Sequence, residues 1–128
     1  IDLHIDAAEP VWTSGDAVAL ERVCLNLAEN AIRYSPPGES VALRAHAEGS
    51  DAVLVVSDTG PGIGAEHLPH LFERFYRVDK ARAREHGGAG LGLAIVEALV
   101  KAHGGSVQVT STVGQGTVFT VRLPLATA

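Results

Sequence analysis

The sequence has no methionine and a single cysteine, and aromatic residues make up only 5% of its 128 positions. One cysteine, Cys24, excludes an internal disulfide, and its apolar neighbours predict core packing in a protein from a reducing compartment. The longest apolar stretch, residues 91–100, is broken by Glu97 and is too short to cross a bilayer. There is no excess of positive charge either, since the formal net charge is −5. That balance disfavours a nucleic-acid-binding domain.

The length and the 46% apolar content fit one domain with one core, and we expect residues 1–128 to form it. The missing initiator methionine and the strand-like opening "IDLHID" indicate a piece of a longer protein.

The periodicity of apolar residues predicts alternating strands and helices. The expected strands are 1–6, 10–13, 41–47, 52–58, 106–112 and 117–123, and the expected helices are about 16–34, capped by Asp16, and about 90–102. This order predicts an α/β (α+β) two-layer sandwich with helices on one face of a mixed sheet. Residues 59–88 carry little regular structure, which in a compact domain is typical of either a functional lid or a disordered segment.

Asp58 follows a buried strand, so its carboxylate needs a hydrogen-bond donor such as an adenine amino group. The glycines Gly60 and Gly62 would let a flat ring approach the main chain, with Ile63 as an apolar wall. The alternative is that Asp58 caps a tight turn. A phosphate-loop Gly-Lys-Ser/Thr pattern is absent from the sequence.

The stretch "GGAGLGLAIV", residues 87–96, places glycines before a helix. The first amides of a helix lack internal partners and attract anions, so Gly88, Gly90 and Gly92 predict a phosphate site. On the first helix, Asn26 and Asn30 share one face, where neutral oxygens suit Mg²⁺. Two exposed surface asparagines are the alternative interpretation.

Five motifs together resemble one family. "NLAENAIRYSPPG", "DTGPGI", "FERFYRVD", "GGAGLGLAIV" and "GQGTVF" are similar, in order, to the asparagine, first glycine, phenylalanine, second glycine and final glycine boxes of the ATP-binding catalytic domain of sensor histidine kinases. These domains belong to the GHKL superfamily, and the resemblance implies a Bergerat fold with an ATP lid at about residues 60–89. Ala89 departs from the family pattern, which often has Thr or Ser there.

The resemblance also implies roles for individual residues. The nucleotide-binding set would be Asn26, Asn30, Arg33, Tyr34, Asp58, Gly60, Gly62, Ile63, Arg77, Lys80, Gly88, Gly90, Leu91, Gly92, Leu93 and Thr117. Within it, Asn30 would hold Mg²⁺, and Asn26 and Arg77 would be catalytic. Thr117 would share a water with Asp58 at the adenine.

By the same resemblance, the domain would bind Mg-ATP and phosphorylate a histidine on a separate dimerisation domain, which then serves a response regulator. None of the six histidines here is followed by an acidic residue and a downstream proline, as the family's acceptor is. The fragment would be a monomer, while the full-length protein would be a homodimer. It would be a cytoplasmic domain of a parent anchored in the plasma membrane.

Three other functions stay open: a GHKL ATPase, an anti-sigma serine kinase, and a regulatory module that binds nucleotide without chemistry. The ATPases carry a glutamate base where this chain has Asn26, and Glu29 lies on another side of the helix. Two further features are His67 and His70, a candidate metal pair, and His103, which we expect to interact with the end of its helix.

Overall fold

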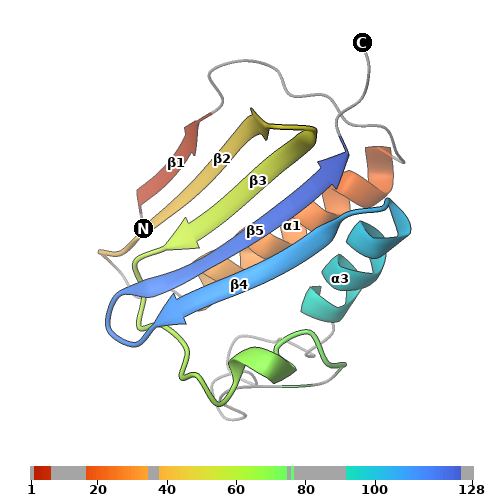
Figure 1. The fold of residues 1–128 in the computed structure, drawn as a ribbon. Helices are drawn as coiled ribbons and strands as arrows, with labels where there is room; N and C mark the ends of the chain where they lie inside the picture. The colour runs from red at the N-terminus through yellow and green to blue at the C-terminus, as the bar shows by residue number, and fades with distance from the viewer. Residues whose placement is uncertain (1, 7–16, 35–37, 75, 77–91, 125–128) are drawn as a thin grey trace.

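A computed structural model describes residues 2–6, 17–34, 38–74, 76 and 92–124 (Figure 1). Its elements are β1 (Asp2–Asp6), α1 (Ala17–Tyr34), β2 (Ser40–Glu48), β3 (Asp51–Asp58), the 3₁₀ turn η1 (Leu68–His70), α3 (Gly92–Ala102), β4 (Ser106–Thr112) and β5 (Gly116–Pro124). Apart from η1, each agrees with a predicted element to within about two residues. The expected strand at 10–13, the cap at Asp16 and the expected helix start at Gly90 lie outside the described residues.

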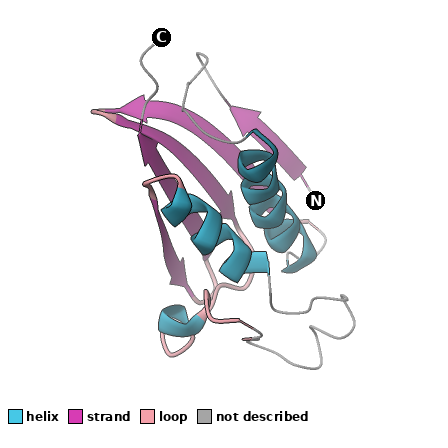
Figure 2. Cartoon of the chain, turned by 90° about the vertical axis from the view of Figure 1, so that its right-hand side faces the viewer, coloured by secondary structure: helices cyan, strands magenta, loops and turns pink. Residues whose placement is uncertain are grey.

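The five strands form one mixed sheet in the order β1-β2-β3-β5-β4. The β1–β2 pair is parallel, and the other three pairs are antiparallel. The parallel pair requires a long crossover, and α1 lies within it. Figures 1 and 2 show α1 and α3 side by side on the same face of the sheet. The predicted two-layer sandwich with a mixed sheet is therefore confirmed.

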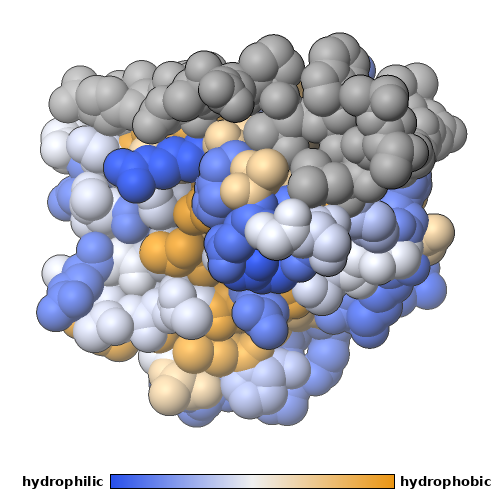
Figure 3. Space-filling model, turned by 45° about the horizontal axis from the view of Figure 1, so that its top comes forward, coloured by the Kyte–Doolittle hydropathy of each residue, from blue (hydrophilic) through white to orange (hydrophobic). Residues whose placement is uncertain are grey.

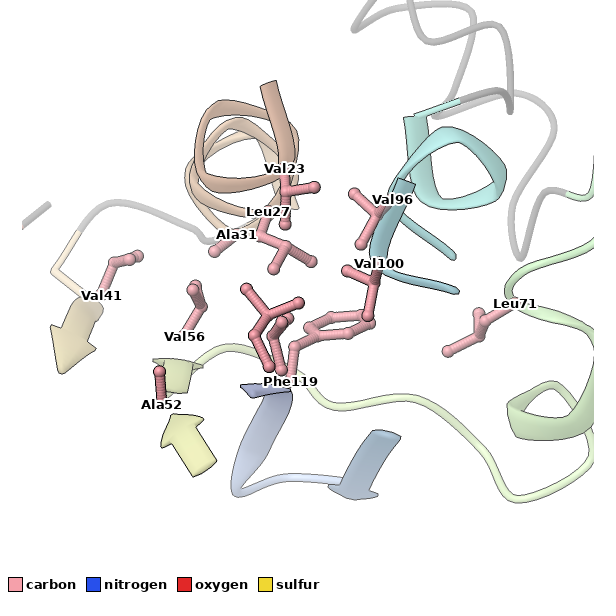
Figure 4. Packing of buried hydrophobic residues seen from close by; sticks show 12 residues of the cluster. Val23, Leu27, Ala31, Val41, Ala52, Val56, Leu71, Val96, Val100 and Phe119 are labelled. Carbon is pink, nitrogen blue, oxygen red and sulfur yellow. The ribbon is translucent and has the colours of Figure 1, made fainter. Parts of the chain in front are cut away.

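The core lies between the helices and this face of the sheet (Figure 4). In α1, Val23, Leu27 and Ala31 are buried at the three-and-four spacing of one helix face. In β5 the buried positions alternate with partly exposed ones, as expected for a strand with one covered face. Helix α3 adds Val96 and Val100, so both helices bury their apolar stripes against one sheet.

The opposite face of the sheet is more polar. Alternate residues of β4 are exposed there: Ser106, Gln108, Thr110 and Thr112. Figure 3, with the top of the molecule turned forward, shows hydrophobic residues in short patches among hydrophilic ones. No described helix is long and apolar enough to cross a membrane.

Two local features refine the sequence interpretation. The β2–β3 hairpin turn is shorter than residues 48–51, the stretch between the two predicted strands, since only Gly49 and Ser50 lie between the observed strands, with Gly49 at φ +60°. His103 Nδ1 lies 2.7 Å from the Leu99 carbonyl oxygen, to which it donates. The expected interaction of His103 with the end of α3 is therefore confirmed.

Several elements end at one edge of the sandwich. The end of β3, the β4–β5 turn, the loop containing η1 and the start of α3 all lie toward the lower edge in Figure 1. The polar and glycine-rich motifs of the sequence therefore gather where the regular elements stop.

Candidate functional site

Asp58 is the last residue of β3, and its side chain is half-buried. Its Oδ1 accepts the Gly60 N–H at 2.9 Å, and the carboxylate also accepts the backbone N–H of Thr117. Burial raises the pKa of the Asp58 carboxyl above its usual value, and the two N–H donors partly offset this effect. The Gly60 bond is also the turn cap of the alternative interpretation, and the same carboxylate can additionally accept a bond from a ligand.

The loop after β3 packs directly against the β4–β5 turn. Gly62 adopts φ +77°, and a Cβ placed on it would lie 2.3 Å from the Thr112 carbonyl oxygen. The Pro61 carbonyl accepts the Gly114 N–H at 2.8 Å. Ile63 packs against the hydrophobic core. Glycine is therefore needed at position 62 both for its backbone conformation and for the space available.

Thr117 is opposite Asp58 in the β3–β5 register and is only 4% exposed. Its Oγ1 lies 2.9 Å from the hydroxyl of Ser111, a residue that the sequence interpretation missed. Gly116 entered the sequence interpretation only as part of the final glycine box. It adopts φ +128°, and a Cβ placed on it would lie 1.9 Å from the Asp58 carbonyl oxygen. The sequence does contain one indication of its role: in the alternating pattern of β4, Ser111 is a hydroxyl residue at a position that faces inward.

Asn26 and Asn30 are half-buried on α1, whereas Glu29 between them is exposed. Asn26 Nδ2 is buried and has no hydrogen-bond partner among the described residues. The same side chain faces the start of α3, because a Cβ built on Gly92 would lie 3.9 Å from Asn26 Oδ1. A buried, unpaired amide is costly, so its position beside a helix N-terminus favours a polar ligand there.

Leu93, next to Gly92, packs partly buried against the core. The structure brings Asp58, Gly60, Gly62, Ile63 and Thr117 together at the end of β3, and it brings Asn26 close to Gly92. Other predicted site residues lie outside the described part: Arg77, Lys80, Gly88, Gly90 and Leu91, together with the side chains of Arg33 and Tyr34.

The candidate metal pair near η1 is not supported. His67 Nδ1 is hydrogen-bonded to the Tyr76 hydroxyl, and His70 Nδ1 to the Glu73 carboxylate. Within the described ranges, no group of three or more His, Cys, Asp or Glu residues could hold a metal ion. Among the described residues, the interpretation of His67 and His70 as metal ligands therefore has no further ligand to complete it.

Known proteins resemble this chain over nearly its whole length. Residues 15–127 match the sequence model of the family described as histidine kinase-, DNA gyrase B-, and HSP90-like ATPase. The sensor protein SrrB of Staphylococcus aureus is 45% identical over 114 residues, which is 89% of this chain and 19% of SrrB. The chain thus spans about a fifth of the length of the curated relatives that it matches.

Solved structures give the same result. The mycobacterial sensor histidine kinase MprB is 36% identical with a TM-score of 0.87, covering 99% of this chain and 85% of that one. Full-length ShkA, in complex with AMPPNP, is 36% identical with a TM-score of 0.83, covering 99% of this chain and 26% of that one. The chain therefore belongs to the histidine kinase-, DNA gyrase B-, and HSP90-like ATPase family, and the relatives that it matches are sensor kinases.

Proposed function

We propose that residues 1–128 form one catalytic domain, with a lid at about 60–89, that binds Mg-ATP and donates the γ-phosphoryl group to a histidine on a separate dimerisation domain. The similarity to sensor kinases supports the reaction class, and the AMPPNP complex of ShkA supports an adenine nucleotide as the ligand. Phosphoryl transfer, rather than ATP hydrolysis, is supported by the amide side chain of Asn26, whose Nδ2 is buried beside the start of α3.

Base recognition is assigned to Asp58. Its carboxylate would accept a hydrogen bond from the adenine amino group, while the N–H groups of Gly60 and Thr117 hold it in place. Gly62 packs closely against the Thr112 main chain, which leaves no room for a side chain there, and Ile63 supplies an apolar contact. A half-buried acceptor strengthens such a bond, because less water competes for it.

The phosphates are assigned to the start of α3. There the first amides of the helix, including that of Gly92, have no intrahelical partner among the described residues, and Asn26 Nδ2 is an available donor. The further residues proposed to contact the nucleotide are Asn30, Arg33, Tyr34, Arg77, Lys80, Gly88, Gly90, Leu91, Leu93 and Thr117.

Magnesium fits the same end of the site. The side chains of Asn26 and Asn30 are half-buried on one face of α1, and neutral amide oxygens are suitable ligands for a hard cation shared with phosphate. Asn30 is the proposed ligand. When bound, the ion supplies neutralisation of phosphate charge during transfer.

A general base for water is missing from the described part of this site. An amide such as that of Asn26 cannot remove a proton from water, and Glu29 is exposed on a different side of α1. This arrangement therefore favours transfer of the phosphoryl group to an external acceptor, with the phosphates aligned by the site, over hydrolysis of ATP. Arg77 is proposed to stabilise the transferring group.

The partners follow from this proposal. The acceptor is the dimerisation domain of the same parent protein, which passes the phosphoryl group to a response regulator. We propose that the isolated domain is monomeric, that the parent is a homodimer, and that the parent is anchored in the plasma membrane with this domain in the cytoplasm.

The test is to mix the domain with the dimerisation domain of its parent and γ-labelled Mg-ATP. The expected product is a labelled acceptor whose phosphate is lost in acid and stable in base. Asn30→Ala should lose transfer while still binding ADP in the absence of magnesium, and Gln108→Ala, on the exposed sheet face, should behave like the wild type. Acid-stable label would indicate a serine kinase instead, and phosphate release without transfer would indicate an ATPase.

A further inference from the structure

We infer that Ser111 is a positioning residue that orients the Thr117 hydroxyl as a hydrogen-bond acceptor toward the base. By this orientation, Ser111 favours adenine over bases that have a carbonyl oxygen in place of the adenine amino group. This inference rests on the proposed function, because it concerns how the same site selects its nucleotide. Ser111 belongs to β4, and its hydrogen-bond partners lie in two other segments, the loop after β3 and the start of β5.

The Ser111 hydroxyl takes part in three hydrogen bonds. It accepts the Ile63 N–H at 2.7 Å, it donates to the Gly116 carbonyl at 2.9 Å, and it lies 2.9 Å from Thr117 Oγ1. The first bond reaches the loop after β3, and the other two reach the start of β5. One hydroxyl therefore joins the two backbone segments that flank Asp58.

Proton counting fixes the direction of the third bond. A serine hydroxyl has one hydrogen and two lone pairs. The Gly116 carbonyl can only accept, so the Ser111 hydrogen goes there, and the Ile63 N–H occupies one lone pair. Thr117 must then donate its own hydrogen to the second lone pair. With that hydrogen committed, the Thr117 oxygen can only accept from any further partner.

This orientation matters because Thr117 is the register partner of Asp58. The carboxylate and the Thr117 oxygen are then two acceptors on neighbouring strands, and together they favour a ligand edge, or a bridging water, that donates. The adenine amino group donates, whereas hypoxanthine and guanine have a carbonyl oxygen in its place. A hydroxyl free to turn would donate to that carbonyl and weaken the discrimination.

The experiment compares ADP with IDP, its hypoxanthine counterpart, by isothermal titration in the absence of magnesium. The wild type should prefer ADP. Ser111→Ala should lower the affinity for ADP by about threefold to tenfold, the effect of one neutral hydrogen bond, and leave the affinity for IDP nearly unchanged, so that the ADP-to-IDP ratio falls by about threefold to tenfold. Ser111→Thr keeps the hydroxyl and should restore the ratio.

The matched control is Ser106→Ala, which makes the same change at an exposed position of the same strand. Should Ser111→Ala not fold, Ser111→Cys retains the side-chain shape with a weak hydrogen-bonding group and should show the same fall in the ratio. A wild-type ratio in folded Ser111→Ala or folded Ser111→Cys would overturn the inference alone. Failure of the wild type to bind ADP would instead overturn the proposed function.

Discussion

Replacement of Asp58 by asparagine isolates the recognition of the base. The asparagine oxygen can still accept the Gly60 N–H that Oδ1 accepts at 2.9 Å, so the turn after β3 should persist. The negative charge is lost, and an amide donor can then oppose the adenine amino group. A hydrogen bond to a charged group contributes about 1.5–3 kcal/mol, so the affinity for ADP should fall by about 10- to 150-fold.

Isothermal titration with ADP at neutral pH measures this change, and thermal denaturation reports whether the variant is folded. Asp51→Asn is the control, because Asp51 begins the same strand at its far end, where it pairs with Arg122. That control should bind ADP like the wild type. If Asp58→Asn is folded and binds ADP within about threefold of the wild type, the assignment of Asp58 to the base is refuted.

Three further outcomes are expected. Because burial raises the pKa of Asp58, the folded state binds more protons than the unfolded state at pH values between the usual pKa and the raised one. The free energy of unfolding of the unliganded protein should therefore fall as pH rises through that window. Asp58→Asn should lack this pH dependence in denaturant titrations across acidic pH. Gly116→Ala should destabilise the fold and weaken ADP binding, because its Cβ would overlap the Asp58 carbonyl oxygen. Gly38→Ala, at φ +90° with open space around it, should cost only about 1 kcal/mol of conformational strain. Chemical denaturation compares the stability of the two variants. Leu27→Ala, at a position with 0% exposure, should lower the free energy of unfolding by about 2–5 kcal/mol in the same assay.

The sequence was sufficient for the elements and for part of the site. Strand β3 was predictable because its apolar run ends at an acidic residue, and that ending itself identified Asp58 as a polar group at the edge of the core. Helix α1 was predictable because Val23, Leu27 and Ala31 repeat at helical spacing. Both inferences use only local periodicity, which the sequence contains directly.

The roles of Ser111 and Gly116 could not be predicted in this way. Each depends on the register between strands, which places Thr117 opposite Asp58 and the Gly116 main chain against the Asp58 carbonyl. Likewise, the buried Nδ2 of Asn26, which has no partner in the part of the chain that the structure describes, depends on how α1 packs beside α3. Such contacts join residues that are distant in sequence, so no spacing within one segment reveals them.

The central claim is that one nucleotide binds between the end of β3 and the start of α3. Amide chemical shifts recorded by NMR during titration with AMPPNP and magnesium test it most directly, because the Asn26 side-chain amide is itself observable. The account predicts the largest shifts at Gly60, Thr117, Gly92 and the Asn26 side chain, with little change at Gly49 in the distant β2–β3 turn. Shifts confined to other surfaces, or none at saturating nucleotide, would contradict it.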